Sequence, residues 1–338
     1  VDKLIETVQK PRTHRYSSSK GINGLRKAQA RYYQYRFGVT LNPETEVIAT
    51  LGSKEGLANL AMAITAPGDV MLVPNPSYPI HPYGFMIAGG TLRHLPTLHD
   101  GIFCPEEYMR ALARAVSHSV PKPVALVVSF PSNPTAQLCN LNFYKDLVTF
   151  AKRHELWLLS DLAYAEIYFD ENPPPSILQV NGAKEVAVEF TSLSKTFSMP
   201  GWRMGFAVGN HRLIEALTRI KSYLDYGAFT PIQVAAATAL DGDTDCIEQI
   251  RGIYRTRRDT LIRSMNRIGW RIPSPPATMF AWAPLPEKFK KLLNKKERDN
   301  TDCDSCPSKK FIPVNHCSNL LHRHRLSEVS WLINVSAF

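Results

Sequence analysis

Long hydrophobic runs are missing from this sequence of 338 residues. None approaches the roughly 18 to 20 apolar residues that a membrane-spanning helix needs. The first residues, VDKLIETVQKPRTHRY, also lack the apolar core that marks a secretory signal peptide. These absences argue against an integral membrane protein or a secreted one, and we expect the protein to be cytoplasmic.

Cysteine is scarce, at six residues. Cys104, Cys139 and Cys246 lie far apart and lack the spacing of a disulfide framework, which suits a reducing compartment. The other three lie among histidines near the end of the chain and invite a zinc interpretation. Only the first pair has finger-like spacing, so we expect no metal site. The residues concerned are Cys303, Cys306, His316, Cys317, His322 and His324.

A basic face that could follow a nucleic acid is also missing, although the formal net charge is +10. Half of this excess comes from residues 288–338, where ten Lys and Arg accompany five Asp and Glu. No predicted element gathers basic residues with interleaved aromatic side chains, as a phosphate-tracking face requires. We therefore expect neither a nucleic acid nor a membrane as a partner.

What the sequence does contain is an alternation of short apolar, β-rich runs with helical patterns. The runs lack polar alternation, which fits strands covered on both faces, and the intervening helices favour a mainly parallel α/β sheet. The runs are EVIATL, GDVMLVP, GGTLRHL, PVALVVSF, LWLLSD, EVAVEF and MGFAVG. Helices are expected at residues 20–35, 56–64, 141–154 and 211–224.

The chain is long enough for one large domain and a smaller one. The pattern becomes helical and charged over residues 231–267, which indicates a long connector into the second domain. After about Phe289 the sequence follows neither the helical nor the strand period. We therefore expect an N-terminal segment at 1–35, a large domain at 36–240, a connector with part of a small α+β domain at 241–289, and an atypical tail at 290–338.

Small and polar residues follow the predicted strands at the points where the strands end. Sheets of this kind bind ligands at the carboxyl ends of their strands, so these residues are expected to share one cleft. GSKEGL, at 52–57, is a small-residue turn that opens a helix, where free backbone N–H groups form a phosphate site. Later strand ends supply Tyr78, Asn133, Asp161, Tyr164, Ser192, Ser194 and Lys195, with Arg203 eight residues further on.

These groups match the parts of one ligand, pyridoxal phosphate. A lysine amine can form a Schiff base with its aldehyde, and a carboxylate keeps its ring nitrogen protonated so that the ring accepts electrons. A phenol and an amide can hold the ring oxygen. Taken alone, Lys195 would more often be a solvated surface lysine. A carboxylate directly after LWLLS, however, is costly to bury without a cationic partner, and a protonated ring nitrogen is such a partner.

The motifs SFPSNPT, SDLAYAEIYF and SLSKTFSMPGWRMGF resemble those of the fold-type I, class I and II aminotransferases. Within that family the chain is most similar to glutamate–pyruvate (alanine) aminotransferases and LL-diaminopimelate aminotransferases, from about Arg15 to about Phe289. The resemblance implies the pyridoxal-phosphate-dependent transferase fold, with a seven-stranded sheet, and a homodimer with shared active sites. The implied reaction moves an amino group between an L-amino acid, with alanine or glutamate favoured, and a 2-oxo acid.

The same resemblance implies roles for individual residues. One set touches the reacting part of the cofactor, a second holds its phosphate, and one residue reaches the neighbouring subunit. The first set is Lys195 as the Schiff-base lysine, Asp161 at the ring nitrogen, Asn133 and Tyr164 at the ring oxygen, and Tyr78 stacked on the ring. The second is Gly52, Ser53, Lys54, Ser192 and Arg203. Tyr16, in HRYSSSKGINGLRKA, is implied to contact the neighbour's phosphate.

The resemblance ends near FAWAPLPEKFK. In this family a strand of the small domain carries an arginine that grips the substrate α-carboxylate, and no such strand is recognisable further on. Arg325, in HRLSEV, lies at a plausible distance from Lys195 in the sequence. We therefore expect an incomplete small domain. Two alternatives stay open: a lyase of the same fold and cofactor, because the same lysine can drive β-elimination, and a non-catalytic relic that only binds the cofactor.

Overall fold

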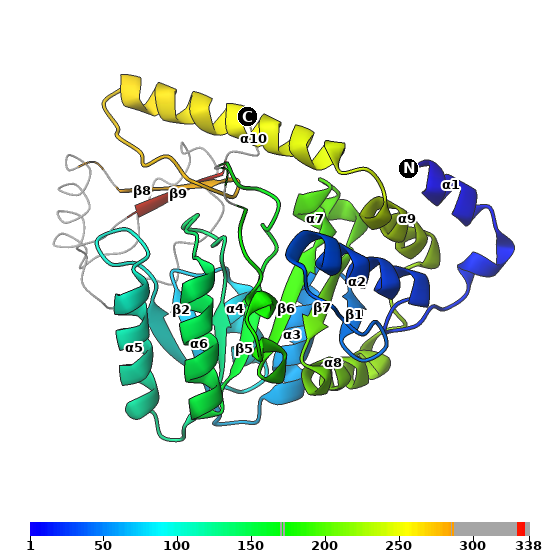
Figure 1. The fold of residues 1–338 in the computed structure, drawn as a ribbon, viewed down its shortest axis with the longest axis horizontal. Helices are drawn as coiled ribbons and strands as arrows, with labels where there is room; N and C mark the ends of the chain where they lie inside the picture. Colours follow the sequence, from blue (N-terminus) through cyan, green and yellow to red (C-terminus); the bar gives the residue numbers. More distant parts are fainter. Residues whose placement is uncertain (170, 172, 285, 287–329, 335–338) are drawn as a thin grey trace, which may run out of the picture.

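The computed structural model describes residues 1–169, 171, 173–284, 286 and 330–334. Figure 1 shows a large sheet covered by helices, with the long helix α10 lying across one end. The sheet has seven strands in the order β1-β7-β6-β5-β4-β2-β3. They are β1 (Val47–Thr50), β2 (Val70–Asn75), β3 (Thr91–Pro96), β4 (Pro123–Val128), β5 (Trp157–Asp161), β6 (Ala187–Ser192) and β7 (Gly205–Gly209).

Each of the seven predicted runs forms one of these strands, and the sheet is mainly parallel, as expected. All residues of β1, β6 and β7 are buried, which explains why their sequences show no polar alternation. One strand has the opposite direction: β7 is antiparallel to both β1 and β6. The registers pair Thr50 with Gly205 on one side and Ser192 with Gly205 on the other.

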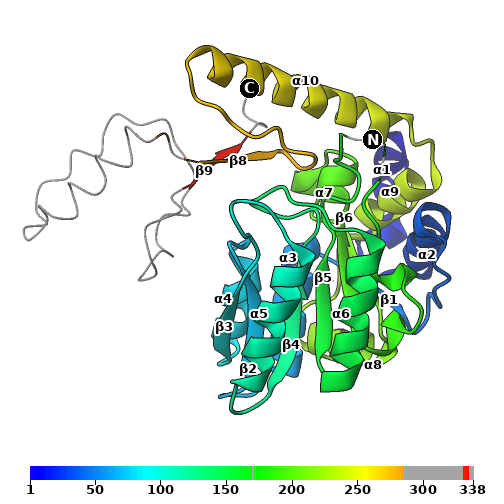
Figure 2. The same ribbon diagram turned by 60° about the vertical axis from the view of Figure 1, so that its left-hand side comes forward.

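Helices form a layer on each face of the sheet (Figures 1 and 2). Successive strand residues point to opposite faces, so Leu126 of β4 joins one core cluster with side chains of α2, α5 and α6. Val127 joins the other, with side chains of α3, α4 and α8. The helices are α2 (Asn23–Phe37), α3 (Ser53–Ile64), α4 (Ile80–Ile87), α5 (Pro105–Ser117), α6 (Leu141–His154) and α8 (His211–Leu224).

Shorter elements surround the seven-stranded sheet and its helices. α9 (Thr230–Asp241) packs against α1 (Asp2–Val8) and α2. α7 (Leu193–Thr196) directly follows β6. Four 3-10 helices span Pro11–His14, Ile177–Gln179, Ala183–Glu185 and Pro200–Trp202. The predicted boundary at residue 35 falls inside α2, and the predicted division into domains otherwise stays a prediction.

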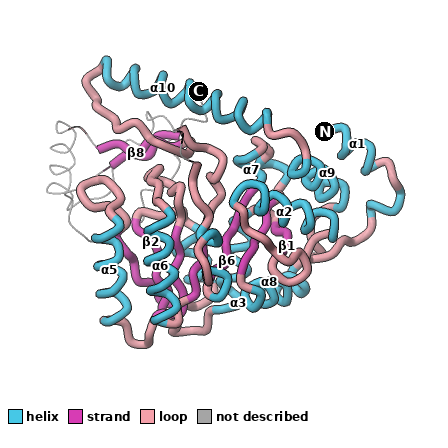
Figure 3. The backbone as a smooth tube through the Cα atoms, viewed as in Figure 1, coloured by secondary structure: helices cyan, strands magenta, loops and turns pink. Residues whose placement is uncertain are grey.

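The second, smaller part of the described chain lies at the end of the sheet where α7 follows β6. It consists of α10 (Asp245–Arg267) and a two-stranded antiparallel sheet of β8 (Phe280–Pro284) and β9 (Ser330–Asn334). Figure 3 shows β8 between α10 and the loops of the large domain. β9 is a strand that the sequence did not indicate, and it contains no arginine, so the expectation that the arginine-carrying strand is missing stays a prediction. Arg325 and the Cys and His residues of the tail lie outside the described residues.

The carboxylate of Glu166 links α10 to the large domain. Glu166 is buried, and its Oε1 atom accepts hydrogen bonds from Tyr32 Oη (2.6 Å) and Arg36 Nε (2.8 Å) of α2. Arg251 of α10 lies 3.5 Å from Oε2 and donates to the backbone oxygen of Glu166 at 3.2 Å. Arg251 also covers the ring of Tyr168 at 3.9 Å. The loop after β5 therefore contacts both α2 and α10.

Among the helices that the structure describes, none has the length and hydrophobicity to span a bilayer. Within the same residues no group of three or more His, Cys, Asp or Glu side chains is placed to hold a metal ion. The thiols of Cys104, Cys139 and Cys246 are free.

Candidate active site

The predicted site residues other than Tyr16 gather where β1, β2, β4, β5 and β6 end and where β7 begins. β5 and β6 are parallel neighbours, with Asp161 paired to Phe190, so the ends of these two strands lie side by side. The loop after β4 brings Asn133 to the same edge, because β4 pairs in parallel with β5. The strand-end argument from the sequence therefore describes the true location of these residues.

Asp161 is held by a histidine that sequence reasoning missed. His81 Nε2 lies 2.9 Å from Asp161 Oδ2, and its ring is completely buried in α4. The other carboxylate oxygen accepts the Ala163 N–H at 3.3 Å. His81 Nδ1 is buried and has no hydrogen-bond partner in the described structure. The sequence signal was its position three residues after Tyr78, in NPSYPIHPYG, at the start of α4.

Tyr164 and Asn133 contact one another, as a shared ligand atom would require. Asn133 Nδ2 donates to Tyr164 Oη at 3.4 Å. Burial raises the pKa of the Tyr164 phenol, and the negative charge of Asp161 raises it further, so the phenol keeps its proton near neutral pH. A protonated phenol and an amide can both donate hydrogen bonds to an anionic oxygen.

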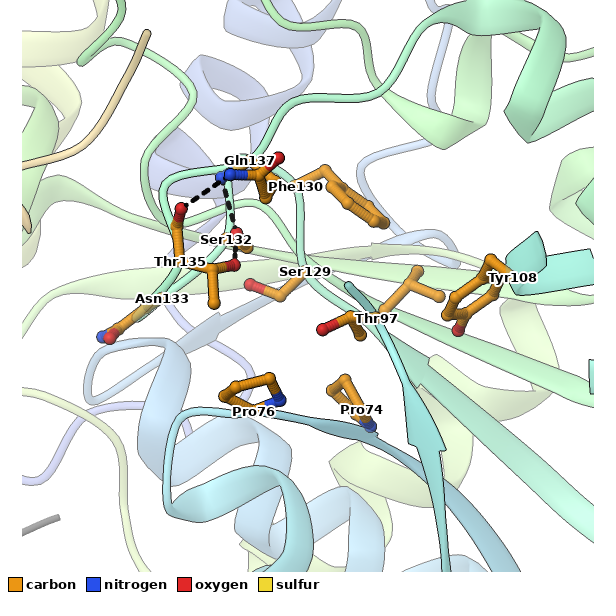
Figure 4. A pocket seen from close by; sticks show the side chains of 11 residues that line it. Pro74, Pro76, Thr97, Tyr108, Ser129, Phe130, Ser132, Asn133, Thr135 and Gln137 are labelled. Carbon is orange, nitrogen blue, oxygen red and sulfur yellow. Dashed lines mark hydrogen bonds between the residues drawn. The ribbon is translucent and has the colours of Figure 1, made fainter. Parts of the chain in front are cut away.

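The loop that carries Asn133 is stiffened by its own hydrogen bonds (Figure 4). Ser132 Oγ lies 2.6 Å from Thr135 Oγ1 and accepts the Gln137 N–H at 2.8 Å. Figure 4 shows that these residues line a small cavity between the ends of β2 and β4, together with Tyr108. The Asn133 amide points away from Tyr108 there. The loop thus holds Asn133 in a defined direction.

Lys195 is half-buried at the start of α7. Its Nζ atom lies 6.0 Å from the centre of the Tyr164 ring. Burial lowers the pKa of this amine, and the nearby positive charge of Arg203 lowers it further. A lowered pKa raises the fraction of the neutral amine, which is the nucleophilic form. Lys195 is therefore suited to covalent chemistry with a carbonyl.

The start of α3 forms a cradle with Arg203. Gly52 has a φ of +85° and caps the helix without a side-chain hydrogen bond. The positive φ strains any other residue at Gly52, and an added Cβ atom, 2.6 Å from Arg203 Nη2, would displace the guanidinium. Arg203 Nη2 donates to the Leu51 oxygen at 2.9 Å. Helix N–H groups and a guanidinium placed together form an anion site.

Ser192 and Tyr78 border this cradle and the Asp161 pair. Ser192 is buried, and its Oγ accepts the Ser194 N–H at 3.2 Å. Tyr78 packs edge-on against His81, with ring centres 5.9 Å apart. Burial raises the pKa of Tyr78, and the charge of Asp161 contributes, which places the phenol near that carboxylate. Lys54 Nζ lies 5.9 Å from the centre of the Tyr78 ring.

Tyr16 is not brought together with the other predicted residues. Its side chain is 86% exposed and stacks on Tyr226, with ring centres 4.6 Å apart. Its predicted role requires a second subunit.

The arrangement fits pyridoxal phosphate in the charge and chemistry of its groups. The start of α3 and Arg203, which the missing side chain of Gly52 leaves open, can bind the phosphate. The half-buried amine of Lys195 can react with the aldehyde. The buried carboxylate of Asp161 matches a protonated ring nitrogen, and the protonated Tyr164 phenol matches the ring oxygen.

Comparison with known proteins gives the same family. The family model of aminotransferase class I and II matches residues 1–300. The chain is 66% identical over 292 residues to the putative aminotransferase AatC of Rhizobium meliloti, covering 86% of this chain and 71% of the relative. It is 50% identical over 303 residues to the glutamate–pyruvate aminotransferase AlaC of Escherichia coli, covering 87% and 72%. LL-diaminopimelate aminotransferases also match.

The solved structure of BacF from Bacillus subtilis, without ligand, superposes with a TM-score of 0.81 at 34% identity. The match covers 88% of this chain and 79% of BacF. These findings confirm the fold and the family that the motifs indicated. The protein is an aminotransferase, and its chain belongs to the aminotransferase class I and II family.

Proposed function

We propose that the described site binds pyridoxal phosphate and uses Lys195 for amino-group transfer. When bound, the cofactor supplies a carbonyl carbon and an electron-withdrawing ring. The observation that carries the proposal is the meeting of a half-buried amine of lowered pKa with Tyr164, and of Tyr164 with the buried Asp161–His81 pair. The class I and II family is known to use this cofactor, which supports the assignment.

Lys195 and Asp161 have complementary proton tasks in this proposal. The neutral amine of Lys195 would anchor the cofactor through its carbonyl carbon with loss of water, and the amine, once free again, would take up the proton that leaves the substrate α-carbon. Asp161 holds a proton at the ring nitrogen through its negative charge. His81 fixes the direction of the Asp161 carboxylate by its 2.9 Å hydrogen bond. Asn133 and Tyr164 would orient the ring by holding its oxygen, and Tyr78 would cover the ring.

The phosphate would be held by the start of α3 and by Arg203. The N–H groups of Ser53 and Lys54 lie at a helix N-terminus, where the helix dipole favours an anion. Ser192 adds a hydroxyl, and Arg203 adds a guanidinium whose position is fixed by the Leu51 and Pro200 oxygens. This anchor orients the reacting end of the cofactor toward Lys195.

The preferred substrates are proposed from the relatives. The Escherichia coli relative is named a glutamate–pyruvate aminotransferase, which supports alanine or glutamate as amino donor and pyruvate or 2-oxoglutarate as acceptor. No observation favours the lyase or the non-catalytic relic.

We expect the purified protein, with pyridoxal phosphate, to convert alanine and 2-oxoglutarate into pyruvate and glutamate in equal amounts. Free ammonia should stay at the background level, because transfer conserves the amino group whereas elimination releases it. Pyruvate, glutamate and ammonia are measured in the same reaction. Alanine has no leaving group on its β-carbon, so a lyase is sought in a second reaction with cysteine and no oxo acid. Pyruvate, sulfide and ammonia formed there in equal amounts would identify a lyase, and cofactor binding without product in either reaction would identify a relic.

We also propose that two copies of the chain share their active sites. The exposed face around Tyr16 is rich in large apolar side chains, and such a face on a soluble protein commonly marks an interface. Tyr16 has no role in its own site, which is consistent with a contact to the phosphate of the partner. The exposed residues of this face include Tyr16, Tyr223, Leu224, Tyr226 and Phe229.

Mixing two inactive variants tests this sharing. Tyr16→Ala removes a residue offered to the partner, and Lys195→Ala removes the amine of its own subunit. In a hybrid dimer formed by co-expression, one of the two sites carries both defects and the other carries none. Random pairing makes about half of the dimers hybrids, so roughly a quarter of the wild-type activity should return. The assay uses limiting pyridoxal phosphate, where loss of a phosphate contact has its full effect. If Tyr16 served its own subunit, no hybrid would contain an intact site and no activity would return.

A further inference from the structure

A buried ion cluster lies directly behind the proposed phosphate site. Lys221, in the last turn of α8, has a side chain that is only 1% exposed. Its Nζ atom donates to Glu55 Oε1 at 2.7 Å and to Asp225 Oδ2 at 2.8 Å. An ammonium group buried to this degree is costly unless it is paired. Both carboxylates therefore offset the cost of burying this ammonium group, and Asp225 alone still pairs with it when Glu55 is changed.

Glu55 connects this cluster to the phosphate cradle. It lies in the first turn of α3, and its Oε2 atom accepts the Leu51 N–H at 2.8 Å. The oxygen of the same residue, Leu51, accepts the hydrogen bond from Arg203 Nη2 at 2.9 Å. A single residue thus separates the Lys221–Glu55 pair from the guanidinium proposed to bind the phosphate.

The position of Glu55 creates an electrostatic conflict. A carboxylate in the first turn of a helix is stabilised by the helix dipole, but the same dipole and N–H groups are what attract a phosphate. Two negative groups at one helix end repel each other, most strongly when one of them is partly buried. Lys221 places a positive charge against Glu55 and removes this conflict, while leaving the bond from Glu55 to Leu51 in place.

The cluster also reaches the segment that carries Tyr16. Asp225 Oδ1 accepts the Gly227 N–H at 2.6 Å, and Ser19 Oγ donates to the Asp225 backbone oxygen. A Cβ atom added at Gly227 would lie 2.2 Å from the Ser18 oxygen, so the 225–227 turn is in close contact with that segment. Lys221 therefore holds the turn next to Tyr226, on which Tyr16 stacks.

We propose that Lys221 is a positioning residue for the cofactor phosphate: it neutralises Glu55 so that the first turn of α3 can accept a dianion. This inference rests on the proposed function. It predicts that Lys221 acts on the phosphate of the cofactor and not on its ring or its bond to Lys195.

The test compares the dissociation constants of pyridoxal phosphate and of pyridoxal, which has the same ring and aldehyde but no phosphate. In Lys221→Met we expect the affinity for pyridoxal phosphate to fall about tenfold or more, and the affinity for pyridoxal to stay unchanged. A general loosening of the fold would weaken both ligands alike. Lys184→Met is the matched control, because Lys184 pairs with Glu46 at 2.9 Å beside the opposite end of β1. It should keep the wild-type preference for the phosphorylated ligand.

Two further variants separate charge from packing. Adding Glu55→Gln to Lys221→Met removes the uncompensated carboxylate and should restore most of the preference for pyridoxal phosphate. Glu55→Gln alone should keep the preference and serves as the test if Lys221→Met does not fold, as judged by circular dichroism. The proposal is overturned if Lys221→Met still prefers pyridoxal phosphate over pyridoxal as the wild type does. It is also overturned if the double variant does not recover this preference, or if Glu55→Gln alone loses it. Equal binding of both ligands by the wild type would instead overturn the phosphate site itself.

Discussion

Lys195→Ala is expected to lower kcat/KM for transamination by at least about 10⁴-fold, because one change removes both the nucleophile and the proton carrier. The cofactor should also dissociate on dialysis, since its covalent anchor is gone, and the visible absorbance of the bound cofactor should disappear. Activity is measured as keto-acid formation and retention of the cofactor by absorbance. Wild-type absorbance and turnover in this variant would remove the basis of the proposed function.

Lys195→Arg is the matched control for charge. Arginine keeps a cation beside Tyr164 but does not lose its proton in proteins, so it cannot act as a nucleophile. We expect Lys195→Arg to be as inactive as Lys195→Ala. In the wild type, the lowered pKa of Lys195 should let the cofactor attach at a pH well below the usual lysine pKa of about 10.4, with the rate rising as the amine loses its proton.

Asp161→Asn is expected to lower kcat about 10²- to 10³-fold while the protein still retains pyridoxal phosphate. The amide has the shape of the carboxylate but no negative charge, so the cationic ring loses its buried partner, a loss of about 3–4 kcal/mol. Tyr164 should respond as well, because the charge of Asp161 contributes to raising its pKa. Single-turnover kinetics with alanine measure the effect separately from substrate binding.

A cofactor analogue with a methylated ring nitrogen tests the cause. Its ring carries a permanent positive charge, so it should recover part of the activity of Asp161→Asn. Asp161→Glu keeps the charge but moves it away from His81 Nε2, and should be less impaired than Asp161→Asn. If Asp161→Asn matched the wild type, or the analogue gave no recovery, Asp161 would not act on the ring nitrogen.

The sequence predicted those parts of the molecule that depend on local pattern. Continuous apolar runs identified all seven strands of the large sheet, and the helices at 141–154 and 211–224 were predicted to the residue. The strand-end rule located Asp161 and Lys195 because Asp161 is the last residue of β5 and Lys195 lies three residues after β6. Such predictions succeed where burial on both faces leaves a clear mark on the amino acids.

Features that depend on pairing between distant segments were not predicted. A buried histidine on a helix has the appearance of an ordinary core residue. The contact of His81 with Asp161 joins residues 80 positions apart, and no local sequence pattern marks it. Lys221 was hidden for the same reason, since its partners are 166 and four residues away. β9 was missed because its five residues follow a long stretch without either period, and only their pairing with β8 defines them.

The reversed direction of β7 has a further consequence for how the anion cradle is assembled. In a wholly parallel sheet the shared edge collects residues that come after strands, yet Arg203 comes before one. Because β7 runs the other way, with Gly205 opposite Thr50, the residue entering β7 meets the residue leaving β1. The register between β1 and β7 thus sets the position of the Arg203 guanidinium beside the start of α3. Inserting a single residue into either strand would shift this register and separate the two groups.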